Sequence, residues 1–223
     1  MTNKLFIGGA TGYTGRRVIE QLKATGAPAP VSWMRAGSRS AAPGYGTVVT
    51  ASNAEVDKLA TAMQGCGAVL QMIGTTRAQF DEHTSYESVD IGTTEALVRA
   101  AERAGVPRFV LLSSIGAGKP MGAYLKAKAR AEALVTGSKL NYVIVRPSFI
   151  LGPGRSAPRA LVPVAKALKA LPGVGGLGES VHGIEVEDLA RLMIYGASAS
   201  LNGKSVLWEG ARLWQALKES VQN

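Results

Sequence analysis

The sequence contains a single cysteine, Cys66, and only two histidines among its 223 residues. One thiol cannot form a disulfide within the chain, and a chain without disulfides fits a reducing cytoplasm. Cys66 stands between two glycines, so we interpret it as a small turn or core residue and not as a nucleophile. Cys66, His83 and His182 lie far apart in the sequence, which leaves no spacing typical of a metal site.

Long hydrophobic runs are also missing. No stretch approaches the roughly 18 uninterrupted apolar residues of a membrane span, and no apolar segment typical of a signal peptide precedes the first glycines. We therefore expect a cytoplasmic protein without a membrane partner. The formal charge is +9, but the lysines and arginines are scattered and form no long basic run. An anionic cofactor and a basic surface explain this charge better than a nucleic-acid partner does.

Short apolar runs alternate with longer amphipathic stretches along most of the chain. Strands are predicted at residues 5–7, 31–34, 47–49, 68–73, 109–112 and 142–145, and helices at 14–24, 54–64, 88–104 and 123–135. This alternation predicts an α/β fold, a Rossmann-type doubly wound parallel sheet with helices on both faces.

The rhythm changes after Pro147, where glycine- and proline-rich loops become frequent. We predict one domain over residues 1–223, in which 1–147 form the cofactor-binding core and 148–223 form a small substrate-side extension. Within the extension we expect a helix near 159–171, shorter elements near 187–197 and 203–208, and a terminal helix near 210–220.

Three glycines follow the first predicted strand at GxxGxxG spacing. A strand, a glycine triad and a helix, in that order, form the setting of a dinucleotide-binding turn. The glycines permit a tight turn and a close approach of the backbone to the pyrophosphate, and the helix N-terminus offers free N–H groups. A turn without a ligand is the plainer alternative, whereas a Walker-type loop is excluded because no Gly-Lys-Ser/Thr follows. The predicted contacts in this turn are Gly9, Thr11, Gly12, Tyr13, Thr14 and Gly15.

Acidic residues are absent from Gln21 to Ala54. A site specific for NAD usually places an Asp or Glu at the end of the second strand, where it holds the ribose 2′-hydroxyl. Here that position carries Arg35, whose guanidinium fits a 2′-phosphate, and Ser38 and Arg39 follow it. The sequence therefore predicts NADPH (NADP) as the cofactor, with a solvated surface arginine as the alternative interpretation of Arg35.

The fifth predicted strand ends in Ser113 and Ser114, and we expect both hydroxyls to face the cofactor crevice at the carboxyl ends of the strands. Tyr124 and Lys128 follow at a spacing that puts them on one helix face. A tyrosine alone holds its proton too firmly for acid–base work at neutral pH, and a nearby ammonium group favours the phenolate. Ordinary helix residues are the alternative interpretation of this pair.

The segments GGATGYTG, LLSS, YLKAK and VRP, in this order, make the chain resemble the atypical or extended short-chain dehydrogenase/reductase superfamily. It looks most similar to the Tat-interacting-protein type of NADPH-binding oxidoreductase and its bacterial relatives. The resemblance implies a catalytic set of Ser114, Tyr124 and Lys128, with Ser113 as a fallback. It also implies that the cofactor is flanked by Ile73, Gly74, Thr75, Thr76, Ser113, Lys128, Pro147 and Ser148. Many relatives carry Gly-Asp after the third strand, whereas this chain has Ala51-Ser52-Asn53 there.

We therefore predict an NADPH-dependent oxidoreductase that reduces a small carbonyl substrate and acts as a monomer or homodimer. A non-catalytic redox-sensing regulator of the NmrA type is one alternative, and an NAD(P)-dependent epimerase or dehydratase is another. The histidines have no assigned role: His83 is expected to be exposed, and His182 is as well explained by structure as by substrate binding. Arg146 belongs to an acid-free stretch from Ala133 to Gly178, interpreted as a solvated face or as a basic lip for an anionic substrate.

Overall fold

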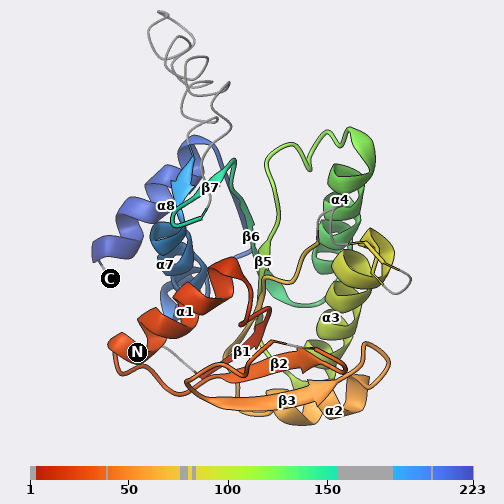
Figure 1. Ribbon diagram of the computed structural model, residues 1–223. Coiled ribbons are helices and arrows are strands. Elements are labelled where there is room, and N and C mark those ends of the chain that lie inside the picture. The colour runs from red at the N-terminus through yellow and green to blue at the C-terminus, as the bar shows by residue number, and fades with distance from the viewer. Residues whose placement is uncertain are drawn as a thin grey trace, which may run out of the picture.

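The computed structural model describes residues 4–38, 40–75, 80–81, 84–154, 183–201 and 203–222. Its centre is a parallel sheet of seven strands in the order β3-β2-β1-β4-β5-β6-β9 (Figure 1). The strands are β1 (Leu5–Gly8), β2 (Val31–Arg35), β3 (Thr47–Ala51), β4 (Ala68–Gln71), β5 (Arg108–Leu112), β6 (Asn141–Arg146) and β9 (Val206–Glu209). The predicted Rossmann-type fold is therefore confirmed.

Helices cover both faces of this sheet, as the crossover connections between parallel strands require. Figure 1 shows α3 and α4 beyond one face and α1, α7 and α8 beyond the other. The bounds are α1 (Tyr13–Ala24), α2 (Val56–Met63), α3 (Gly92–Ala104), α4 (Gly122–Thr136), α7 (Val186–Gly196) and α8 (Ala211–Gln222). Alternate side chains of a strand feed opposite layers, so Phe6 enters the core under α2 and α3 while Leu5 and Ile7 enter the core under α1 and α7.

The segment before α3 differs from the prediction of one helix over 88–104. A π-helix, η2 (Tyr86–Ile91), precedes α3 and runs directly into it. Ser85 and Ser88 cap its start reciprocally, each side chain meeting the other residue's backbone N–H. Such wide turns inside helices often occur at functional sites, and this one buries Asp90 between Val89 and Ile91. Gly105 ends α3 in the left-handed conformation at φ +68°.

The described part of the C-terminal extension joins the main fold. Strand β9 pairs with β6, and α7 lies against α1, where the Gln21 amide donates to the Glu187 carbonyl at 2.7 Å. Two short strands, β7 (Ile150–Leu151) and β8 (Ile184–Glu185), form a separate pair, and η3 (Ala199–Leu201) is a single 3-10 turn. Predictions for 159–171, Arg39, Thr76, His83 and His182 lie outside the described residues. Among the helices described, none is long and apolar enough to cross a bilayer.

Candidate active site

The glycine turn between β1 and α1 is built by close backbone approaches. Gly9 has φ +90°, and a Cβ atom there would lie 2.8 Å from the backbone nitrogen of Ile73. A Cβ on Gly15 would overlap the carbonyl oxygen of Gly9. The Gly12 N–H donates to that same carbonyl at 3.0 Å. Side chains are thus excluded from Gly9 and Gly15, and the turn is brought beside the segment that follows β4.

The first turn of α1 suits an anionic group. Gly12 is the N-cap and supplies no side-chain cap, and the first turn has no acidic residue. Backbone N–H groups and the positive end of the helix dipole are the usual partners of a phosphate in this setting. Thr11 is half-buried and Thr14 is buried, whereas Gly12 is exposed. The Tyr13 hydroxyl donates to the Pro153 carbonyl at 3.0 Å, which ties the turn to the segment after β7.

The rim of this turn is basic. Arg35, at the end of β2, and Ser38 are both exposed, and the Ser38 N–H donates to the Arg35 carbonyl at 3.0 Å. Arg16, directly after the third glycine, is a cation that the sequence analysis missed; its Nε donates to the Thr11 carbonyl at 2.8 Å. Arg16 also borders a hollow of about 410 Å³ beside the turn. The other residues lining the hollow are Ala10, Thr11, Ile19, Glu20, Lys23, Ala41, Ala42, Pro43 and Gly44.

Asn53, which follows β3, makes a hydrogen bond to a distant segment of the chain. Its amide nitrogen donates to the Ser88 carbonyl at 2.9 Å. A Cβ on Gly92 would lie 3.0 Å from that nitrogen. Asn53 thus joins the end of β3 to η2 and the start of α3.

A buried ion pair lies at the carboxyl end of β4. Lys128 Nζ on α4 is 2.9 Å from Asp90 Oδ1 on η2, and the two side chains are 9% and 1% exposed. The other carboxylate oxygen of Asp90 accepts the Thr75 N–H at 3.1 Å. Asp90 was missed by the sequence analysis, although an acidic residue flanked by the apolar Val89 and Ile91 was a signal for it.

Tyr124, the predicted proton donor, lies near this pair, and Ser114 follows β5. Lys128 Nζ is 5.8 Å from the centroid of the Tyr124 ring, and Tyr124 itself is 36% exposed. A Cβ on Gly74 would lie 3.0 Å from Lys128 Nζ, so the lack of a side chain at this position leaves room for the ammonium group. Ser114 is half-buried and its hydroxyl donates to the Ile115 carbonyl at 3.3 Å. Lys126 and Arg130 are exposed, as predicted from their position on the helix.

The ends of β5 and β6 are fastened to each other. The Ile115 N–H donates to the Pro147 carbonyl at 2.9 Å, which places Ser114 beside the predicted nicotinamide-side segment of Pro147 and Ser148. Gly9, Ile73, Gly74, Thr75 and Lys128 likewise meet at the ends of β1 and β4. The order of the strands reverses between β1 and β4, and the crevice at such a reversal is where open α/β sheets bind ligands.

Ser113 requires a correction. The expectation that both serine hydroxyls face the crevice is wrong for Ser113, which is 4% exposed and whose hydroxyl donates to Glu132 on α4. Successive residues at a strand end point to opposite sides, so only one of the two serines can face the crevice. Ser113 is therefore neither a cofactor contact through its hydroxyl nor a fallback for Ser114.

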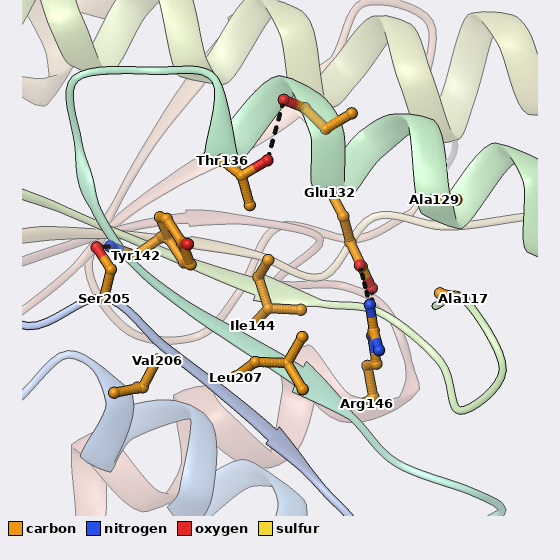
Figure 2. A pocket seen from close by; sticks show the side chains of 11 residues that line it. Ala117, Ala129, Glu132, Thr136, Tyr142, Ile144, Arg146, Ser205, Val206 and Leu207 are labelled. Atoms are coloured by element: carbon orange, nitrogen blue, oxygen red, sulfur yellow. Dashed lines mark hydrogen bonds and ion pairs between the residues drawn. The ribbon is translucent and has the colours of Figure 1, made fainter. Parts of the chain in front are cut away.

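Arg146 also departs from both interpretations made for it, because it belongs to a buried cluster. Its guanidinium meets Glu132 twice, at 2.9 Å and 2.6 Å (Figure 2). It also meets Glu209 once, at 2.9 Å. Hydrogen bonds that the guanidinium donates to Glu132 are the main reason that the pKa of Arg146 is raised above its usual range. Each of the three guanidinium nitrogens is therefore bound to a carboxylate, and Arg146 provides no basic lip for an anionic substrate.

Cys66 lies in the core and offers no reactive thiol. Cys66 is 6% exposed and its burial raises the pKa of the thiol. A buried thiol with a raised pKa is a poor nucleophile, as the sequence analysis expected. Across the part of the chain that the structure describes, no group of His, Cys, Asp and Glu side chains could hold a metal ion.

Comparisons with known proteins agree with this geometry. A family model described as NAD(P)H-binding matches residues 9–194. Protein FMP52, mitochondrial, from Chaetomium globosum is 30% identical over 205 residues, which cover 88% of this chain and 88% of that protein.

Two solved structures share the fold. The enzyme WbmH from Bordetella bronchiseptica, in complex with NAD+, matches with a TM-score of 0.67 and 19% identity over 94% of this chain and 76% of that one. The oxidoreductase ylbE from Lactococcus lactis matches with a TM-score of 0.64 and 20% identity over 99% and 97% of the two chains. The chain therefore belongs to the NAD(P)H-binding family, an atypical branch of the short-chain dehydrogenase/reductase superfamily.

Proposed function

We propose that this protein is an NADPH-dependent oxidoreductase that reduces a small carbonyl compound. The observation that carries the proposal is the placement of Lys128: it is buried, held by Asp90, and lies near both Tyr124 and Gly74, which follows β4. Burying an ammonium group costs desolvation free energy unless the charge is paired, so such a group is kept where it has a function. The structurally similar protein ylbE is described as an oxidoreductase, which supports the same class of reaction.

NADPH is favoured over NADH by charge at the rim of the glycine turn. Arg35 is exposed, and no acidic side chain of the described residues pairs with it. Arg16, directly after Gly15, is exposed and lines the hollow that residues 41–44, downstream of β2, also line. The relative WbmH was solved with NAD+, so the preference rests on these two arginines, which suit a 2′-phosphate.

Tyr124, Ser114 and Lys128 each have a separate role in the proposed reaction. Bound NADPH supplies a hydride to the carbonyl carbon. The Tyr124 hydroxyl then donates its proton to the carbonyl oxygen, and its exposed position lets solvent return that proton. The Ser114 hydroxyl orients the carbonyl oxygen, and Lys128 favours the phenolate left on Tyr124 and has N–H groups to spare for the nicotinamide ribose.

The test measures NADPH oxidation against aldehydes, ketones and quinones for wild type, Tyr124→Phe and Lys128→Met. We expect both variants to lose turnover by about a hundredfold or more, and Tyr124→Phe to bind NADPH as wild type does. Tyr142→Phe is the matched control, because Tyr142 is a half-buried tyrosine on β6 that lines the hollow of Figure 2 on the far side of α4. Equal turnover in wild type and Tyr124→Phe would contradict the mechanism.

One observation favours a second function, that of a redox-sensing regulator that binds the cofactor without turnover. The charge of Lys128 is already neutralised by Asp90 at 2.9 Å, which weakens its effect on Tyr124. The same assay decides between the two functions. Tight NADPH binding without turnover of any carbonyl compound would establish the sensor and overturn the enzyme.

A further inference from the structure

Three aromatic side chains form a continuous wall beside the candidate catalytic residues. The ring of Phe80 meets the ring of Tyr86 edge to face, with centroids 4.7 Å apart and planes at 76°. The ring of Tyr86 in turn lies 5.8 Å from the ring of Tyr124, with planes at 56°. We call Phe80, Tyr86 and Tyr124 the aromatic wall; it runs outward from the proposed proton donor.

The exposure of the wall is unusual for this chain. Phe6, Trp33, Phe109 and Trp208 are buried in the core, whereas Phe80 is 39% exposed and Tyr124 36% exposed. Neighbouring apolar side chains that stay exposed together indicate a binding surface, whereas single ones do not.

A fourth exposed apolar side chain, Met121, stands at the start of the helix that carries Tyr124. It is the N-cap of α4, three residues before Tyr124, and it is 83% exposed. Among the described residues the other large apolar side chains that are exposed are Val48 and Val221, which stand singly on β3 and α8.

From this arrangement we propose that the protein's substrate is a carbonyl compound that carries an aromatic ring, and that the aromatic wall binds that ring. Aromatic rings prefer tilted or edge-to-face neighbours, and the tilt between Tyr86 and Tyr124 offers a ring faces and edges together. The contact would leave the carbonyl group of the ligand beside the Tyr124 hydroxyl. This inference rests on the proposed reductase site, since it names the substrate class of that site.

Binding is measured first, with ligands that cannot be reduced. Benzamide and cyclohexanecarboxamide share the amide group and differ in whether the ring is aromatic. For protein saturated with NADP+, we expect calorimetry or ligand-observed NMR to show benzamide binding about tenfold tighter. Phe80→Leu and Tyr86→Leu should each remove most of that preference while NADP+ binding is unchanged. Tyr142→Leu, which removes a half-buried ring outside the wall, should retain it.

Turnover is measured second, with benzaldehyde and cyclohexanecarbaldehyde. We expect KM for benzaldehyde to rise about tenfold in Phe80→Leu while kcat is retained. A benzamide preference that survives both wall substitutions, or no preference in wild type, overturns the inference even if aldehydes are reduced. A preference that the wall substitutions abolish, with no aldehyde reduced, supports the wall as a ring-binding site and overturns only the proposed reaction.

Discussion

Helix α4 carries two buried charged residues one turn apart, and their surroundings differ. Lys128 points to Asp90 on η2, while Glu132 points to Arg146 on β6. Both pairs are almost closed to solvent, so both paid a large desolvation cost when the chain folded. The difference lies in how completely each charge is satisfied.

The Glu132 cluster is saturated. Both oxygens of Glu132 meet Arg146 (Figure 2). The Ser113 hydroxyl adds a third contact to Glu132, and Glu209 accepts from the remaining guanidinium nitrogen. In the Asp90 pair, by contrast, Asp90 is the one charged partner of Lys128 among the described residues. An ammonium group has three donors. The comparison teaches that the saturated cluster fastens α4 to the sheet, whereas the unsaturated pair keeps donors for a ligand.

The largest expected effect comes from breaking the saturated cluster. Glu132→Leu removes the main counter-charge of a buried arginine, and we expect a loss of about 3–5 kcal/mol in the free energy of unfolding. Urea unfolding measures this loss. The double variant Glu132→Leu/Arg146→Met should recover most of it, because an apolar pair replaces an ion pair at little cost. A double variant as unstable as the single one would show that charge is not the cause.

Breaking the unsaturated pair should affect function more than stability. Asp90→Asn keeps the shape of the side chain and removes the charge that holds Lys128. We expect kcat/KM for NADPH-dependent reduction to fall by about tenfold to a hundredfold and the free energy of unfolding by about 1–3 kcal/mol. Steady-state kinetics and urea unfolding on the same preparation test this. If stability fell while the kinetics and their pH profile stayed as in wild type, the pair would have only a structural role, as the Glu132 cluster has.

Crowding the lysine should give a smaller effect. In Gly74→Ala the new Cβ would lie 3.0 Å from Lys128 Nζ and 3.3 Å from Asp90 Oδ1, so the lysine must move by a few tenths of an ångström. Small misplacements of catalytic groups are costly, and we expect kcat to fall about threefold to tenfold with the thermal midpoint nearly unchanged. A kcat equal to that of wild type would show that the lysine position is not critical.

The smallest effect is expected at an exposed pair that joins the same two elements. Arg130 on α4 binds Glu87 on η2 through both guanidinium nitrogens, with side chains 60% and 65% exposed. Arg130→Met should change the free energy of unfolding by less than about 1 kcal/mol and leave turnover unchanged. A loss of turnover like that of Asp90→Asn would mean that the link between η2 and α4 matters, and not the burial of Lys128.

Local sequence patterns predicted the sheet, most of the helices and the glycine turn. Periodicity marks which residues face inward, and Gly9, Gly12 and Gly15 have a steric signature that is readable without a structure. Partners across the fold have no such signature, because Asp90 and Lys128 are brought together only by the π-helix η2 and the crossover from β5. Ser113 was misassigned for a related reason: which of two adjacent serines faces the crevice depends on where the strand's alternation stops. Arg146 looked solvated because its acidic partners, Glu132 and Glu209, lie outside its own acid-free stretch.

The strand order also has a consequence for synthesis on the ribosome. Strands β2 and β3 add in turn to one side of β1, then β4 pairs with its other side, and β5, β6 and β9 each add to the outermost strand on that side. A nascent chain can therefore extend its sheet without undoing any pairing. The open edge of β6 stays unpaired until β9 is made, which begins at Val206. A chain stalled before that residue would carry an unpaired edge strand, a ready template for aggregation between growing polypeptides.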